Sequence, residues 1–223
     1  MTIKLYAYIL IKHKQLQNGF SMRKARPTQF IGTVTAIILG IVGVNLISSG
    51  ISEDSLKSCL RITAQTSLCL FLTTFIAAPL HRLKKSNTSK WLMQHRRYLG
   101  IAFGVSHIIH LGIILWLLNG FYQNDWLGLT SISSLITGGL GYAFIFAMLI
   151  TSNNMAIRKL GHKNWKRLHS FGMYTLFCIF TLTYVGLLTQ NWMLNSPFII
   201  LLGFCAILRF KARVSFFRQG IFA

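Results

Sequence analysis

The sequence predicts an all-α integral membrane protein, a bundle of six transmembrane helices with both termini in the cytoplasm. Of its 223 residues, 53% are hydrophobic and only 12% are charged, whereas soluble domains are about a quarter charged. The apolar segments are continuous over lengths close to the roughly 20 residues that a helix needs to cross a bilayer. Because these segments do not alternate with polar residues, helices are favoured over barrel strands.

Six segments are long and apolar enough to be predicted as spans. They are Phe30–Ser48, Ile62–Leu80, Tyr98–Leu118, Ser131–Ile150, Leu168–Leu188 and Trp192–Leu208. The last two belong to one uncharged stretch that is too long for a single helix. The polar turn Thr189-Gln190-Asn191 divides this stretch, so we predict a tight helical hairpin there.

Basic residues are concentrated on one side of this predicted topology. Among the 23 Lys and Arg residues, only Lys57 and Arg61 fall on the other side, together with all three acidic residues, Glu53, Asp54 and Asp125. Cytoplasmic loops of membrane proteins are rich in Lys and Arg, so we predict that both termini are cytoplasmic. The formal net charge of +20 then reflects topology and contact with anionic lipid, and we do not expect a nucleic acid partner.

The predicted transmembrane domain covers residues 30–208. A basic cytoplasmic arm (residues 1–29) precedes it and a basic cytoplasmic tail (residues 209–223) follows it. Two interpretations apply to residues 1–21. Their apolar part, Ile3–Ile11, predicts a short interfacial helix, whereas the basic run that begins at Met22 resembles a translation start preceded by a non-native extension.

Histidines are the ionisable residues that the predicted spans contain, since no Lys, Arg, Asp or Glu lies within them. Ionisable side chains inside a bilayer are costly and mark functional sites. His107 and His110 share one face of the third span, roughly 15 and 20 Å beyond Arg97 at about 1.5 Å per residue. His169 lies at the start of the fifth span, and His95 lies among the basic residues before the third.

Two interpretations of the buried histidines follow. The first is a cofactor site, because imidazole is the usual axial ligand of haem iron in helix bundles. The second is structural, with each imidazole hydrogen-bonded to Ser and Thr residues of the fourth and fifth spans. Gly100 and Gly104 of the third span allow the same two interpretations, room for a flat macrocycle or close helix packing. Two histidines on one face without a carboxylate favour the cofactor site.

Several short motifs resemble the ferric reductase-like transmembrane domain family. They are Arg61–Leu68, Ala77–Leu80, Arg96–Gly100 leading to His110, Thr151-Ser152, Arg158–Gly161, Trp165, Leu168-His169 and Tyr174. The resemblance covers about residues 30–212. The most similar branch comprises the haem-binding membrane subunits of the bacterial periplasmic methionine sulfoxide reductase system, the MsrQ/YedZ type.

This resemblance implies an electron-transfer subunit with haem b, and with FMN as a further candidate cofactor. It implies a multi-pass protein of the bacterial inner membrane that takes electrons from a cytoplasmic flavin reductase or a membrane quinone. The electrons would pass to a periplasmic molybdenum-dependent reductase partner that repairs oxidised methionine. The family's iron ligands correspond to His110 in the third span and His169 in the fifth, with His107 as an additional histidine.

The sequence departs from this branch where the second fifth-span histidine is expected, because that position is Leu182. At about 1.5 Å per residue, His110 and His169 also differ in depth by roughly 16 Å, too much for one iron. Three arrangements remain. Haem binds mid-membrane through His110 or His107, or near the cytoplasmic face between His169 and His95, or haem is lost.

Two other classes of function remain open from the sequence. A haem-free membrane anchor or assembly subunit would keep the same fold without redox chemistry. A proton or small-solute conduit would use the His107 and His110 pair, although the absence of carboxylates from the predicted spans argues against it.

Overall fold

The computed structural model describes residues 27–221, and this part of the chain contains helices and no strands. The helices are α2 (Pro27–Ser49), α3 (Glu53–Leu83), α4 (Asn87–Phe121), α5 (Trp126–Leu129), α6 (Ile132–Ile150), α7 (Asn154–Leu160), α8 (His162–Leu188) and α9 (Trp192–Ile221). Six of them, α2, α3, α4, α6, α8 and α9, are long and apolar enough to cross a membrane. The predicted all-helical protein with six spans is therefore confirmed. The two interpretations of residues 1–21 lie outside the described residues.

The long helices extend beyond the predicted apolar spans. α3 begins at Glu53 rather than Ile62, and α4 begins at Asn87 rather than Tyr98. Serine capping boxes set both starts: Ser52 with Ser55, and Ser86 with Ser89. Hydropathy marks the part of a helix that lies in hydrocarbon, whereas capping side chains mark where the backbone hydrogen bonds begin. For the same reason α9 continues through most of the basic segment predicted as a tail.

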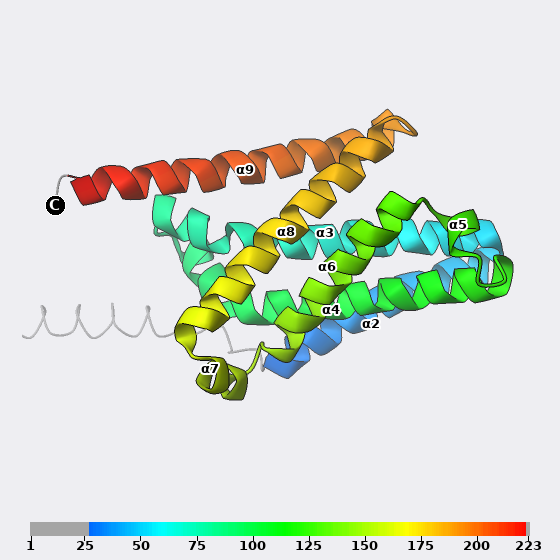
Figure 1. Ribbon diagram of the computed structural model, residues 1–223, viewed down its shortest axis with the longest axis horizontal. Coiled ribbons are helices and arrows are strands. Elements are labelled where there is room, and N and C mark those ends of the chain that lie inside the picture. The colour runs from blue at the N-terminus through cyan, green and yellow to red at the C-terminus, as the bar shows by residue number, and fades with distance from the viewer. Residues whose placement is uncertain (1–26, 222–223) are drawn as a thin grey trace, which may run out of the picture.

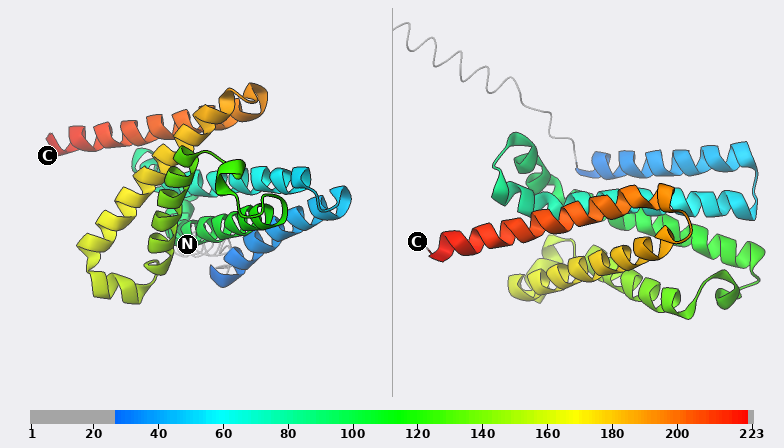
Figure 2. Two further views of the ribbon diagram at one scale, coloured as in Figure 1. Left: turned by 45° about the vertical axis from the view of Figure 1, so that its right-hand side comes forward. Right: turned by 90° about the horizontal axis from the view of Figure 1, so that it is seen from above.

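The spanning helices run alternately up and down the bundle, as Figure 1 shows. One end, which we call the basic end, holds the α3–α4 connection, α7 and both ends of the described chain. The opposite end, which we call the acidic end, holds the α2–α3 turn, α5 and the α8–α9 turn. The views in Figure 2 agree with this arrangement. The termini of the described chain therefore share one end of the bundle.

α3 and α4 form the centre of the bundle, with α2 and α9 packed against α3 and with α6 and α8 adjoining them. The core between α3, α4 and α8 is aromatic. Phe71 lies 5.3 Å from Phe103 and 5.2 Å from Phe180, measured between ring centroids. All three rings are buried. This aromatic layer lies between the part of α4 that carries His107 and His110 and the start of α8, which carries His169.

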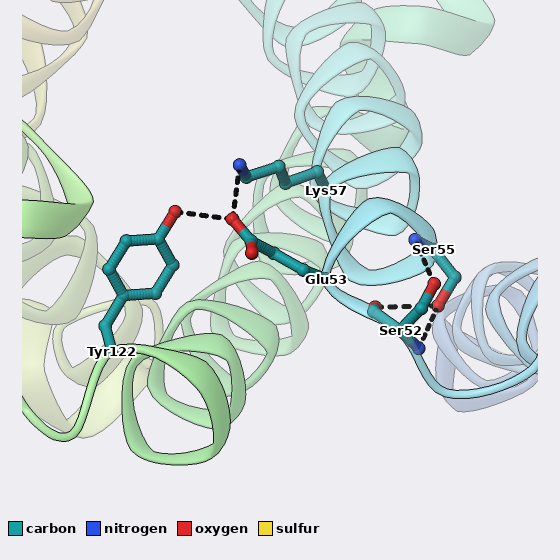
Figure 3. Close-up of polar contacts among 5 residues, drawn as sticks. All are labelled: Ser52, Glu53, Ser55, Lys57 and Tyr122. Carbon is teal, nitrogen blue, oxygen red and sulfur yellow. Dashed lines mark hydrogen bonds and ion pairs between the residues drawn. The ribbon is translucent and has the colours of Figure 1, made fainter.

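A small polar network ties α3 to α4 at the acidic end. The Glu53 carboxylate lies 2.6 Å from the Lys57 ammonium and accepts a hydrogen bond of 2.6 Å from the Tyr122 hydroxyl (Figure 3). The carboxylate is also in the first turn of α3, where the helix dipole favours negative charge. Of the two basic residues predicted for this end, Lys57 is therefore neutralised within the protein.

Candidate functional site

The two α4 histidines lie side by side in the bundle. His107 and His110 are stacked with 5.3 Å between ring centroids and 29° between ring planes. His107 also contacts Phe103 from its own helix, Tyr142 from α6 and Phe180 from α8. The pair is thus surrounded by aromatic side chains of three helices.

His110 is held from α3 by the hydroxyl of Thr63. The Thr63 Oγ1 lies 2.8 Å from Nδ1 of His110 and 2.8 Å from the backbone carbonyl of Cys59, one turn earlier on α3. The hydroxyl also reaches the Leu60 carbonyl at 3.1 Å, and with its single hydrogen assigned to these carbonyls Oγ1 accepts from the imidazole Nδ1–H. Nε2 of His110 is then the nitrogen with a lone pair. The structural interpretation predicted partners from the fourth and fifth spans, but this partner belongs to the second.

His107 has no such partner. Its Nδ1 is buried and makes no hydrogen bond to any described residue. The nearby Tyr142 hydroxyl donates instead to the backbone carbonyl of His107, at 3.4 Å. A buried polar atom without a partner costs about 1–3 kcal/mol and needs an explanation. The pair therefore offers Nε2 of His110 and the nitrogens of His107, of which Nδ1 is buried.

A cavity of about 420 Å³ lies nearer the basic end, between α3, α4, α6 and α8. Its lining includes His169 from α8, the basic side chains Arg96, Arg97 and Lys166, and the α4 residues Gly100, Phe103 and Gly104. This volume is within the usual range of small-molecule sites, about 300–1,000 Å³. Three cations at one cavity favour a ligand that carries carboxylate or phosphate groups.

His169 is held at this cavity by the end of α6. Its Nε2 lies 3.0 Å from the Thr151 hydroxyl, and the same hydroxyl donates to the Ala147 carbonyl at 2.7 Å. The Trp165 ring packs on the imidazole with 4.3 Å between centroids, and its indole N–H donates to the Thr151 carbonyl at 2.9 Å. Nδ1 of His169 is thus the nitrogen without a hydrogen-bond partner among the described residues.

The two histidine levels are distinct. His107 packs against Phe180 with 5.7 Å between ring centroids, and Phe180 lies roughly 16 Å further along α8 than His169 at about 1.5 Å per residue. The α4 pair and His169 therefore lie at different levels of the bundle. Phe103 joins the levels, since it lines the cavity and lies 5.5 Å from His107 between centroids.

The structure does not bring His95 to the cavity. The His95 Nδ1 lies 2.9 Å from the Trp91 carbonyl of its own helix, and its ring is stacked on Trp91 at 4.4 Å. The α4 residues that line the cavity include its neighbours Gln94, Arg96 and Arg97, but not His95 itself. The predicted pairing of His95 with His169 around one cofactor is therefore not assembled in this structure.

Leu182 lies on the outer surface of α8, with 65% of its area exposed. A histidine at this position would face away from the α4 pair. The buried residues of this part of the helix are Phe180 and Tyr184. Position 182 thus makes no contact with the α4 pair in the bundle as it is packed here.

Sequence analysis missed the threonines that orient the histidines. A signal for them exists in the spacing of polar residues on two neighbouring helices. Thr63 and Ser67 are one turn apart on α3 and bond to His110 and Ser106, one turn apart on α4, at 2.8 and 2.7 Å. Such paired polar positions on one face indicate a hydrogen-bonded helix interface.

The fold and these buried imidazoles define a multi-pass helical membrane protein with ionisable groups enclosed between its spans. The family model described as "Ferric reductase like transmembrane component" matches residues 62–181, more than half of the chain. The chain belongs to this family. No solved structure matches it.

Curated relatives include proteins of Salmonella paratyphi B (strain ATCC BAA-1250 / SPB7), Salmonella newport (strain SL254) and Salmonella heidelberg (strain SL476). Each is named protein-methionine-sulfoxide reductase heme-binding subunit MsrQ and is 33% identical over 123 residues. The matched region is 54% of this chain and 60% of each relative. The chain thus spans less than two thirds of the length of these relatives.

Proposed function

We propose that this protein is a haem b-binding electron-transfer subunit of a membrane oxidoreductase system. The observation that carries the proposal is the His110 imidazole, fixed through Nδ1 by Thr63 while Nε2 keeps its lone pair. Iron-ligating histidines characteristically donate their other N–H to an oxygen acceptor, which fixes the tautomer and the ring orientation. The names of the curated relatives support the same cofactor.

The two α4 imidazoles supply donor atoms of the kind that an iron porphyrin takes as ligands. His110 would be the ligand of the iron, and the buried, unpartnered Nδ1 of His107 is a second donor atom beside it. Phe103, Tyr142 and Phe180 pack around His107 and make this side of the pair apolar. Haem supplies reversible one-electron chemistry when bound. The chain contributes by ligating and orienting it and by keeping its surroundings apolar.

A second site is proposed at the cavity near the basic end, with His169 as its ligand residue. The available nitrogen there is Nδ1, because Thr151 engages Nε2. Arg96, Arg97 and Lys166 line the same cavity and would neutralise haem propionates or the phosphate of FMN. Phe103 lies between this cavity and His107, so both sites share one wall.

The charge distribution supports an orientation of the bundle in the membrane, and with it a direction for the proposed electron flow. Lys and Arg residues concentrate at the basic end, which we assign to the cytoplasm of a bacterial inner membrane, together with both termini. Electrons would enter there from a flavin reductase or a membrane quinone. They would leave at the acidic end to a periplasmic molybdenum-dependent reductase, such as one that acts on methionine sulfoxide, in keeping with the names of the relatives.

A haem-free membrane anchor or assembly subunit is the second candidate. The hydrogen bonds of His110 to Thr63 and of His169 to Thr151 favour it, because they satisfy one nitrogen of each imidazole without iron. The buried Nδ1 of His107 and the cavity beside His169 have no role in such a protein.

A reduced-minus-oxidised absorption spectrum with haem-to-protein stoichiometry tests the proposal. The protein purified after haem-supplemented expression should show a b-type Soret band that shifts on dithionite reduction. A variant with His107, His110 and His169 all changed to Ala should lose this band and the reductase activity of the assembled system. A colourless wild-type preparation, with partner assembly and activity unchanged in the triple variant, would establish the anchor instead.

A further inference from the structure

A second cavity, of about 390 Å³, lies at the acidic end between α3, α8 and α9. It shares no lining residue with the cavity beside His169. Its polar lining includes Arg61 and Gln65 from α3, Tyr184 from α8 and Asn195 from α9. Neither the electron-transfer function nor the family assignment explains this cavity.

Two of these polar side chains are almost fully buried. Tyr184 is 3% exposed and Asn195 is 6% exposed. The Tyr184 ring packs on Phe198, but its hydroxyl makes no hydrogen bond to any described residue. The Asn195 amide nitrogen donates to the carbonyls of Leu187 and Asn191 at 3.0 and 2.9 Å, which fixes the α8–α9 turn and leaves its Oδ1 without a described partner. Neither oxygen is among the fully buried atoms that lack a partner, so both are open to the cavity and available to a polar ligand there.

Arg61 determines the charge of that ligand. Its guanidinium makes no ion pair or hydrogen bond to a described residue, and no acidic side chain lines the cavity. Glu53, two turns earlier on α3, is engaged by Lys57 and Tyr122. A guanidinium binds carboxylates and phosphates through two parallel N–H donors, and Gln65 adds an amide one turn further along. The cavity therefore offers donors for an oxyanion.

The rest of the lining is the polar pair Gln190 and Asn191 of the α8–α9 turn together with three apolar residues. Ala64, Leu187 and Leu194 line the cavity, and the neighbouring Trp192 is exposed at the start of α9, as is usual at the membrane interface. A ligand that suits this wall carries an apolar portion beside its oxyanion. Simple extension of Arg61 toward headgroups would account for its charge but leaves the Tyr184 hydroxyl without a partner.

We propose that this cavity binds the phosphate of an anionic phospholipid, held by Arg61 with Gln65 and Tyr184, while the acyl chains run along Leu187 and Leu194. The phosphate accepts from all three side chains. Bound lipid would join α3 to the α8–α9 hairpin at the acidic end of the bundle.

Native mass spectrometry tests this site. The full chain is reconstituted in nanodiscs that contain phosphatidylglycerol and transferred to detergent, and the lipid molecules that remain bound are counted. Arg61→Gln should lower the number of retained phosphatidylglycerol molecules about tenfold, since one charge-assisted contact is lost. Lys57→Gln is the matched control, because Lys57 lies one turn away but is paired with Glu53, and it should retain wild-type lipid. Equal retention in Arg61→Gln and the wild type, or equal loss in both variants, would refute the site.

Tyr184→Phe provides a second, nearly isosteric variant and should lower retention about threefold, as expected for one hydrogen bond of roughly 0.5–1.5 kcal/mol. If this variant retains as much phosphatidylglycerol as the wild type, the Tyr184 hydroxyl does not bind the phosphate. Competition with 10-fold excess inorganic phosphate separates the sources of the oxyanion. If inorganic phosphate alone removes the bound lipid, the ligand of the cavity is a free anion and the lipid proposal is wrong. Loss of partner association in Arg61→Gln with unchanged lipid retention would assign Arg61 to a protein interface and refute the proposal.

Discussion

The hydroxyl of Thr63 on α3 accepts a hydrogen bond from Nδ1 of His110 on α4, at 2.8 Å. This contact joins the two helices at the centre of the bundle and fixes one imidazole tautomer. The hydroxyl hydrogen is itself committed to the Cys59 carbonyl, so Thr63 cannot reverse its role without breaking a backbone contact. Thr63 is therefore a positioning residue for the proposed iron ligand.

Thr63→Val should weaken haem retention by about 10–100-fold, the usual effect of losing a partner of a metal-ligating histidine. The change keeps the shape of the side chain but leaves the His110 N–H without an acceptor. Haem content per protein and midpoint potential measure the effect. Thr63→Ser should restore both. Thr66→Val is the matched control, because the Thr66 hydroxyl bonds only to the Ile62 carbonyl of its own helix, and equal behaviour of the two valine variants would contradict the positioning role.

Single histidine variants should separate the two proposed levels. His110→Ala should abolish the haem signal of the mid-bundle site, whereas His169→Ala should remove only the signal that belongs to the cavity near the basic end. The reason is the distance between the levels, since Phe103 and Phe180 separate His107 from the cavity. Redox titration followed by absorbance resolves the components. His162→Ala, an exposed histidine at the start of α8, should titrate like the wild type, and simultaneous loss of all signals in both site variants would indicate one shared cofactor.

The spans were predictable because hydrocarbon imposes one requirement on every segment that crosses it, a continuous apolar stretch of helical length. The helix starts were not found from the same signal. Glu53 and Asn87 begin α3 and α4 outside the apolar region, where serine caps rather than hydropathy decide the boundary. Both capping boxes have serine at the third helical position, where glutamate or glutamine is usual.

The site was predictable only as far as one helix determines it. The spacing of His107 and His110 places them on one face of α4, and the structure stacks their rings. The partner Thr63 depends on the register between α3 and α4, which no local pattern fixes. His95 was predicted as a partner of His169 because the two lie at a similar depth in the membrane. A contact also requires that the side chain point from its helix toward the cavity, and the His95 ring is stacked on Trp91 instead.

The orientation of the bundle predicts opposite labelling of its two ends. In a background in which all four cysteines are changed to Ser, Asp125→Cys at the acidic end should react with a membrane-impermeant maleimide in intact cells. Lys163→Cys at the basic end should react only after permeabilisation. Both positions are exposed, and the expectation follows from the positive-inside rule. Labelling of Lys163→Cys in intact cells, with protection of Asp125→Cys, would reverse the proposed direction of electron flow.

Gly104 and Gly100 lie one turn apart on α4 and line the same cavity, but they tolerate a side chain differently. A Cβ at Gly104 would lie 2.6 Å from Leu149 Cδ2 and 2.7 Å from its Cγ, whereas a Cβ at Gly100 would lie 3.8 Å from Thr74 Cγ2. Gly104→Ala must displace Leu149 and with it the contact between α4 and α6, so it should destabilise the bundle by about 1–3 kcal/mol.

Gly100→Ala meets ordinary van der Waals contact and gains helix propensity, up to about 1 kcal/mol. The midpoint of thermal unfolding in detergent should therefore fall for Gly104→Ala and stay level or rise for Gly100→Ala. Haem content adds a second readout, because the two alanines enter one cavity from neighbouring turns. If Gly104→Ala unfolds at the wild-type temperature, α4 and α6 are not packed as closely as this contact requires, and room for a macrocycle becomes the better explanation of the glycine.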